Sequence, residues 1–525
     1  MHATELVLLG LMSAAAGLSA LARWVRVPYP ILLVLGGLAV GFIPGMPPVE
    51  LPPELVLVLI LPPLLYSAAF FSSPRDLRAD LRAISTVAVG LVLATAAAVA
   101  VVAHAVVDGM SWAAAFTLGA IVSPTDPLAA STIARRLGVP RRLITLLEGE
   151  GLANDATALV VYRIAVAVAA GGTFLWWEAG LRFLLGVVGG VAIGLVVGWL
   201  AALVRGRLDD PPVEIFVSLV TGYAAYLPAE RLGASGVLAA VTAGLYVGWQ
   251  SPTLASPSTR LLGFSFWEVL DYLLNALLFM LVGLQLQPIL ARVSGTSLAE
   301  LVGYALLVSA VVIGVRLAWS FTVPYLVRLL DRRPTQVLRR VGARDRLVSG
   351  WSGMRGAVSL AAALAIPLTA DGRPFPDRDV IIFVTFGVIF VTLVGQGLTL
   401  PALIRRLGVR DDGAAEREEL RARREATDAA LARLEELAGE DWTLEDTIDR
   451  LRRAYDYRRR RLSARDDEQD DSYEERSLAY QRLVRELLEA QRRAIVGLRN
   501  QGVISSDVMR RVERELDLED SRLEI

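Results

Sequence analysis

The chain has no cysteine and no lysine, and its 525 residues include only two histidines. The absence of cysteine excludes a disulfide framework and thiol chemistry. The scarcity of histidine leaves almost no room for histidine-based acid–base catalysis. The sequence also lacks zinc-ligand spacing, Rossmann and P-loop glycine patterns and a convincing Ser/His/Asp set. It therefore predicts neither an enzyme nor a nucleic-acid-binding protein, and we interpret the all-arginine basic content as genome bias.

Apolar residues are abundant and unevenly distributed. The chain is 54% hydrophobic with a mean hydropathy of +0.50, whereas soluble proteins are about 45–50% apolar. Long apolar runs fill residues 1–408 and are almost absent from 409–525. Residues 1–410 hold 30 arginines against 23 acidic residues, while 411–525 hold 23 against 31. We expect a transmembrane domain at 1–408 and a charged, helical cytoplasmic tail at 409–525.

The apolar runs predict thirteen membrane-spanning helices, because each span needs about 20 apolar residues. No positively charged segment precedes the first run, so we expect it to stay as a helix and not to be cleaved as a signal peptide. The predicted spans are 3–22, 28–43, 53–71, 83–107, 112–134, 143–170, 180–204, 213–228, 233–250, 264–288, 297–327, 347–369 and 379–404.

The arginines of the connecting segments alternate in a way that tests this number of spans. Segments after odd-numbered spans contain 22 arginines, and segments after even-numbered spans contain four. Arginine collects on the cytoplasmic side of a membrane. The pattern predicts a multi-pass membrane protein with its N-terminus outside and its tail in the cytoplasm.

One span carries glycine at every fourth position, at Gly186, Gly190, Gly194 and Gly198. Small residues at this spacing form a helix face that allows close contact with another helix. The face fits two interpretations, packing within one molecule or formation of a homodimer.

Two prolines interrupt the fifth span at the sequence SPTDP. Pro124 and Pro127 bracket Thr125 and Asp126, and proline in a helix removes a hydrogen-bond donor and disrupts the preceding turn. We expect a broken helix whose freed carbonyl groups can serve as ligands. Asp126 has a second interpretation as the N-cap of the inner half-helix.

The sixth span carries three carboxylates in the sequence EGEGLAND. At a rise of about 1.5 Å per residue, Asp155 lies near the membrane midplane and Glu150 lies shallower, while Glu148 is near the cytoplasmic mouth. Glu150 and Asn154 share a helix face. A midplane carboxylate beside an amide indicates an ion or proton site, whereas Glu150 also fits a purely structural ion pair.

The twelfth span contains an arginine within the sequence SGWSGMRG. Arg355 has the same predicted depth as Glu150, so we expect these two residues to form an ion pair. The glycine and serine residues around Arg355 predict a second broken helix, and two such helices in opposite halves suggest an inverted repeat. Arg316 and Glu214 have no predicted partner.

The motifs SPTDPLA, EGEGLANDATALVVY and GMRGAVSLA, in this order, resemble those of the monovalent cation:proton antiporters of the NhaP and sodium–proton exchanger type. The resemblance covers about residues 5–408. It implies an all-α polytopic fold of about 13 transmembrane helices, with inverted repeats and two broken crossing helices. It also implies a homodimer in which a core domain moves against a dimerisation domain.

The resemblance implies a role for each site residue. Asp155 would bind Na⁺ and H⁺ alternately, beside Asn154, which marks the branch associated with electroneutral exchange. Glu150 would pair with Arg355 and help to hold Asn154 or the ion, and Thr125 and Asp126 would supply a backbone oxygen and a water-mediated contact.

One position departs from the family pattern, which commonly has serine after the glutamate. Here the residue is Gly151, so a side-chain ligand is lost, and water or Ser123 can take its place.

The predicted function is therefore exchange of Na⁺, or of Li⁺ or K⁺, for protons across a lipid bilayer, without a cofactor. Two alternatives stay open: a proton-coupled solute carrier on a similar fold, and a non-transporting receptor with a signalling tail. Residues 414–438, 472–500 and 504–518 of the tail read as charged helices.

Overall fold

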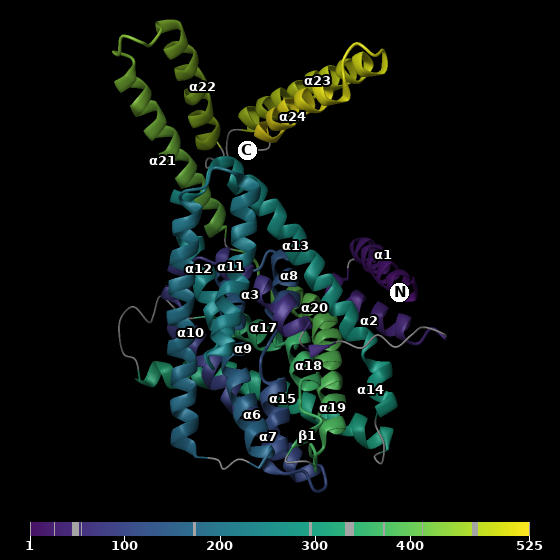
Figure 1. The fold of residues 1–525 in the computed structure, drawn as a ribbon. Coiled ribbons are helices and arrows are strands. Elements are labelled where there is room, and N and C mark those ends of the chain that lie inside the picture. Colours follow the sequence, from purple (N-terminus) through teal and green to yellow (C-terminus); the bar gives the residue numbers. More distant parts are fainter. Residues whose placement is uncertain are drawn as a thin grey trace. The chain divides into compact units, whose positions relative to one another are not determined.

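A computed structural model describes most of the chain. It covers residues 2–25, 27–44, 52–53, 55–171, 175–292, 297–330, 341–370, 373–411, 413–464 and 471–523. The chain divides into two compact units, Met1–Asp411 and Asp412–Ile525. Each unit is almost entirely helical (Figure 1).

The first half of the larger unit begins with helices of very different lengths. Its elements are α1 (His2–Val25), α2 (Tyr29–Gly41), η1 (Leu55–Ile60), α3 (Leu61–Phe70), α4 (Pro74–Ala79), α5 (Leu81–Ser85), η2 (Thr86–Leu91), α6 (Val92–Val106), α7 (Trp112–Val122), α8 (Pro127–Arg136) and α9 (Arg141–Ala169). The segments η1 and η2 are π-helical turns that continue directly into α3 and α6.

The second half contains the longest helices and one short β-hairpin. Its elements are α10 (Trp176–Arg205), α11 (Pro211–Arg231), α12 (Gly236–Leu254), α13 (Pro257–Leu284), α14 (Leu286–Arg292), α15 (Leu298–Leu330), α17 (Ala343–Trp351), α18 (Ala357–Leu364), β1 (Thr369–Ala370), β2 (Arg373–Pro374), α19 (Arg378–Phe390), the π-helical η3 (Val391–Gln396) and α20 (Gly397–Leu407). The two strands pair antiparallel, with Thr369 opposite Pro374.

Every predicted span coincides with one helix or with consecutive helical segments. Seven helices of the described chain are long and apolar enough to cross a membrane, and the shorter helices at 29–41 and 56–70 are apolar too. The fifth predicted span is broken between α7 and α8 and the twelfth between α17 and α18, as their prolines and glycines predicted. The all-helical membrane fold is confirmed, and the total of thirteen crossings stays a prediction.

The glycine face of α10 packs against α12 within the molecule (Figure 1). A Cβ atom at Gly190 would lie 2.6 Å from the carbonyl oxygen of Ser235, and one at Gly194 would lie 2.5 Å from that of Ala239. Close approach of the two backbones therefore requires these glycines. The packing interpretation is confirmed, and this face is not available to form a homodimer.

The smaller unit consists of charged helices that pair in sequence: α21 (Ala414–Leu437) with α22 (Glu445–Ala464), and α23 (Asp471–Asn500) with α24 (Ser506–Leu523) (Figure 1). The first pair is tied by Arg452, which donates hydrogen bonds to both carboxylate oxygens of Glu435. Helix α22 was not among the predicted tail helices, although apolar residues recur at helical spacing in its arginine-rich sequence, at Ile448, Leu451, Tyr455 and Leu462.

Candidate functional site

The two broken helices meet at their breaks. The main-chain N–H of Asp126, between α7 and α8, donates a hydrogen bond of 2.8 Å to the carbonyl oxygen of Met354, between α17 and α18. Gly356 makes this approach possible, because a Cβ atom there would overlap the side chain of Asp126. Two unwound segments thus satisfy each other's backbone groups inside the protein, where irregular backbone at membrane depth is tolerated.

Asp126 caps the N-terminus of α8. Its Oδ1 accepts a hydrogen bond of 2.9 Å from the N–H of Leu128, and Pro127 occupies the first helical position, which needs no donor. By contrast, the residue that precedes α18 is Gly356, which has no side chain to cap the helix. The capping interpretation of Asp126 is therefore confirmed as a structural role.

Glu150 forms its ion pair with Arg316 of α15, and not with Arg355 as predicted. Nη1 of Arg316 donates to Oε1 of Glu150, and Nη2 donates to Oε2 at 2.9 Å. Both side chains are buried. Since this bidentate geometry satisfies both carboxylate oxygens, the predicted Glu150–Arg355 pair is wrong.

Arg355 lies in the second break, where it interacts with Glu150 electrostatically but makes no ion-pair contact with it. Its Nη1 donates to the carbonyl oxygen of Gly353 at 3.2 Å, and its Nε has no hydrogen-bond partner among the described residues. Depth along a regular helix was the basis of the predicted pair, and depth does not fix the direction of a side chain once the helix unwinds. Gly353 also leaves the space that Arg316 needs, because a Cβ atom there would overlap the Arg316 stem.

A hydrogen-bonded chain connects the ion pair to Asn154. The hydroxyl of Thr125 donates to Oε1 of Glu150 at 2.6 Å, and Nδ2 of Asn154 donates to the Thr125 hydroxyl at 2.9 Å and to its carbonyl oxygen at 2.8 Å. A carbonyl oxygen only accepts, so the amide nitrogen must face Thr125. Oδ1 of Asn154 consequently points the other way, buried and without a partner among the described residues.

Asp155 is the next residue on α9 and is 9% exposed. No hydrogen bond joins its carboxylate to another residue in the described ranges. The Asp126 carboxylate is close enough to interact with it electrostatically. Two carboxylates that face each other repel when both are ionised, so a bound proton or cation stabilises the pair.

Gly151 serves the packing of α9 against the first break. A Cβ atom at this position would overlap the ring of Pro127. Serine at position 151 would supply a ligand but would disrupt this contact with Pro127. Ser123, the predicted substitute, donates its hydroxyl to the carbonyl of Ala120 at 2.9 Å within its own helix, which leaves its oxygen lone pairs free to accept.

The assembled donor set suits a hard monovalent cation. Asp155 and Oδ1 of Asn154 supply unpartnered oxygen atoms, whereas the oxygens of Glu150 are already occupied. Hard cations take oxygen ligands, as Ca²⁺ and Mg²⁺ do. Within the described part of the chain no cluster of three His, Cys, Asp or Glu residues could hold a resident metal ion.

Sequence reasoning missed one residue of this site, Arg316. The signal available was an arginine in the interior of a 33-residue apolar helix that contains no acidic residue near it. Such a residue requires a partner on another helix, although the sequence does not say which one.

Comparison with known proteins identifies the family. Residues 10–406 match the model of the family described as sodium/hydrogen exchanger, transmembrane. An uncharacterised Na⁺/H⁺ exchanger of Mycobacterium tuberculosis is 39% identical over 522 residues, covering 98% of this chain and 96% of the relative. The uncharacterised Na⁺/H⁺ exchanger YjcE of Escherichia coli is 32% identical, with 94% of each chain covered.

Solved structures agree on the fold. The sodium proton antiporter MjNhaP1 of Methanocaldococcus jannaschii superimposes with a TM-score of 0.59 at 18% identity, covering 78% of this chain and 99% of that one. At this identity the similarity shows the fold alone, and it extends over nearly the whole of the solved chain. The family match and the similar relatives go further, and on them this chain belongs to the sodium/hydrogen exchanger family.

Proposed function

We propose that the chain exchanges Na⁺ for protons across the bacterial inner membrane. The observation that carries this proposal is an unpartnered Asp155 carboxylate beside an unpartnered Asn154 oxygen, next to the crossing of two broken helices. Its relatives include a sodium, potassium, lithium and rubidium/H⁺ antiporter of Bacillus pumilus, 33% identical over 76% of this chain, so Li⁺ and K⁺ are further candidate substrates.

The mechanism is competition for one carboxylate. A bare carboxylate inside a membrane protein is costly, so Asp155 takes either a proton or a cation. Oδ1 of Asn154 supplies a second oxygen to the cation, while the chain from Thr125 to Glu150 and Arg316 holds that amide in place. If only the loaded forms change between inward and outward openings, cation and proton move in opposite directions without ATP.

The same geometry gives each remaining residue a role. Glu150 is a positioning residue, because Arg316 and Thr125 occupy its oxygens. Asp126 is a candidate for a water-mediated contact with the ion, in addition to its cap. Because Asn154 is neutral, the Asn–Asp pair adds one ionisable group to the site, which supports electroneutral exchange.

The domain boundaries, membrane orientation and oligomeric state are also part of the proposal. We assign transport to residues 1–408 and a cytoplasmic location to the tail at 409–525, with the N-terminus outside, as the arginine distribution predicts. A homodimer is part of this proposal, through a surface other than the α10 glycine face.

Transport by reconstituted protein tests the proposal. Vesicles that contain the full chain and a pH-sensitive dye should report proton movement when Na⁺ is added, and Asp155→Asn should abolish it. Glu148→Gln, at a more exposed carboxylate that pairs with Arg135, is the matched control and should keep most of the activity. Normal cation-dependent proton movement by a folded Asp155→Asn protein would contradict the proposal, and a signal driven by an organic anion instead would favour the solute carrier.

A further inference from the structure

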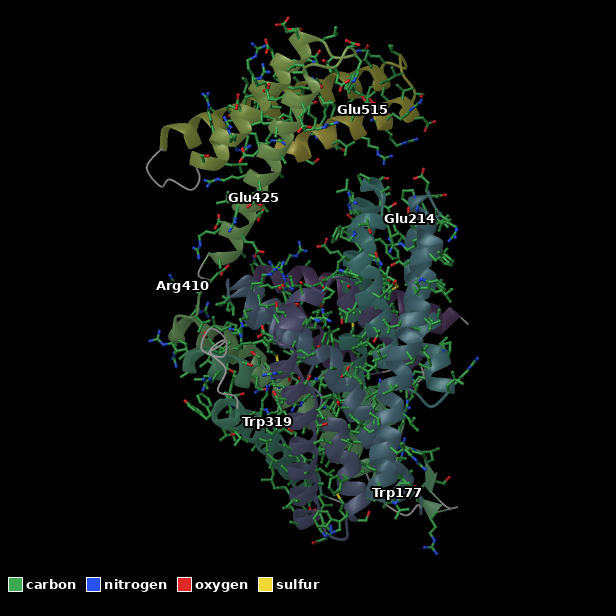
Figure 2. The ribbon with its side chains drawn as sticks, turned by 90° about the vertical axis from the view of Figure 1, so that its left-hand side faces the viewer. Trp177, Glu214, Trp319, Arg410, Glu425 and Glu515 are labelled. Atoms are coloured by element: carbon green, nitrogen blue, oxygen red, sulfur yellow. The ribbon has the colours of Figure 1, made fainter. Side chains whose placement is uncertain are left out.

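A cavity of about 520 Å³ lies away from the ion site, among the ends of α3, α10, α11, α12 and α13. Arg205, the last residue of α10, lines it. Figure 2 shows Glu214, which begins the next helix, at the opposite end of these helices from Trp177. The predicted topology places this end at the cytoplasmic side of the membrane.

Arg205 is buried without the hydrogen bonds that its guanidinium requires. It is 4% exposed, and its Nε and Nη1 have no partner in the part of the chain that the structure describes. Its nearest carboxylate oxygen, Oε2 of Glu214, is 3.8 Å from Nη2, which is too long for a hydrogen bond. Glu214 also contacts α13, since its Oε1 accepts from the hydroxyl of Thr259 at 2.9 Å, while its Oε2 is buried without a hydrogen-bond partner in the described chain.

Two arginines line the cavity, and the buried Glu214 carboxylate beside Arg205 compensates one of their two charges. Arg260 is the second arginine, and no aspartate or glutamate is among the described residues that line the cavity. Nε and Nη1 of Arg205 are unpartnered N–H donors on different edges of one guanidinium, and phosphate oxygens are acceptors that arginine binds well. A buried guanidinium with free donors is costly, so an oxyanion that supplies acceptors stabilises it.

The opening of the cavity adjoins apolar surface. Phe71 and Phe264 line the cavity and stack on each other with ring centroids 5.3 Å apart, yet they are 42% and 58% exposed. Leu261 on the same helix is 65% exposed. A polar interior next to an apolar rim suits a lipid, whose headgroup can enter the cavity while its acyl chains contact the rim. The polar interior alone also suits a free anion.

We propose that this cavity binds a phosphate oxyanion, through Arg205 in the interior and Arg260 at the mouth. The same chemistry is supplied by the headgroup of an anionic phospholipid and by free phosphate. The volume of about 520 Å³ is within the range of about 300–1,000 Å³ of small-molecule sites, so it accommodates a phosphoglycerol headgroup. The ligand would tie α10 to α13 and is separate from the transported ions.

Thermal unfolding of the purified full chain in a zwitterionic detergent tests this site. The first comparison is phosphatidylglycerol against phosphatidylcholine. The second is inorganic phosphate against chloride at equal ionic strength. Phosphatidylglycerol should raise the unfolding temperature more than phosphatidylcholine. Arg205→Gln should weaken the apparent affinity by about tenfold or more, because the positive charge and its unpartnered donors are lost. Arg207→Gln removes the same charge two residues later, from an exposed side chain, and should change little.

A second variant keeps the test valid if Arg205→Gln does not fold. Gly263→Leu fills the cavity without touching a charge, since a Cβ atom at Gly263 meets only Ile215, at 3.8 Å. Gly303→Leu, where a Cβ atom meets nothing within 4 Å, is its control.

The responses also separate the two sources of the oxyanion. Stabilisation by phosphatidylglycerol alone identifies a lipid, stabilisation by phosphate alone identifies a free anion, and stabilisation by both supports a general phosphate site. The proposal fails if neither probe stabilises the protein more than its reference, or if Arg205→Gln and Gly263→Leu respond as the unchanged protein does. Transport through Asp155 is independent of either result.

Discussion

The two helix breaks lie against each other but contribute different chemistry. The break between α7 and α8 presents oxygen atoms: the hydroxyl and carbonyl of Thr125 and the carboxylate of Asp126. The break between α17 and α18 presents glycine and a guanidinium, at Gly353, Gly356 and Arg355. One break therefore faces the ion site with acceptors, while the other supplies space and positive charge.

Under the proposed function, this difference assigns ion binding to the first break and support to the second. A cation needs acceptors, and Asn154 and Asp155 adjoin the first break. The second break lets its neighbours approach: Gly356 accommodates Asp126, and Gly353 accommodates Arg316. If this division is right, substitutions in the second break act by displacing groups of the first.

The largest expected effect is at the arginine that the sequence left without a partner. Arg316→Gln leaves the buried Glu150 carboxylate uncompensated, and breaking a buried ion pair in this way costs about 3–5 kcal/mol. Arg355→Gln should cost less, because no carboxylate depends on it for hydrogen bonds. Unfolding temperatures of both variants in detergent check the order.

A double substitution provides the control for that comparison. Glu150→Gln combined with Arg316→Gln removes both charges and should recover part of the lost stability. If Arg355→Gln were the more damaging variant, or if the double variant recovered nothing, the pairing seen in the structure would be contradicted.

The next effect concerns the contact between the two breaks. Gly356→Ala places a Cβ atom on Asp126, so the breaks must separate, and overpacking of this kind costs about 1–3 kcal/mol. Transport should fall together with stability, since the displaced residue belongs to the first break. Gly314→Ala on α15, where a Cβ atom meets nothing within 4 Å, should leave both unchanged. Equal behaviour of the two variants would show that the breaks do not need this contact.

A comparable cost is expected where α9 packs on the first break. Gly151→Ser restores the residue common in the family but overlaps Pro127, so we expect a loss of about 1–3 kcal/mol and slower exchange. Gly303→Ser is the control in open space. Tighter apparent Na⁺ affinity in vesicles at unchanged stability would mean that the sequence interpretation, a missing ligand, is the correct one.

Features with local causes were predictable from the sequence. Pro124 and Pro127 fix the first break, the glycines near Arg355 indicate the second, and Asp126 before Pro127 is a standard N-cap arrangement. Helix α22 was missed although Ile448, Leu451 and Leu462 recur at helical spacing, because charged residues fill most of the positions between them.

Features that depend on distant contacts were not predictable. Glu150 and Arg316 are 166 residues apart, and two arginines of similar depth compete for one carboxylate in any sequence-based argument. The choice between them depends on how an unwound segment turns. The role of Gly151 likewise depends on a proline 24 residues earlier, in another helix, and only the packed structure brings the two together.

The smallest effect on stability separates the two roles of Asp126. Asp126→Asn retains an oxygen that accepts from Leu128 N–H, so the cap should survive, whereas Asp126→Ala should cost about 0.5–2 kcal/mol. If the first break supplies charge to the ion site, Asp126→Asn should still weaken Na⁺-dependent proton movement, because the carboxylate near Asp155 has become neutral. Stability from thermal unfolding and apparent Na⁺ affinity in vesicles together decide the point. Unchanged affinity in Asp126→Asn would reduce Asp126 to a helix cap and leave Asp155 and Asn154 as the side chains that bind the ion.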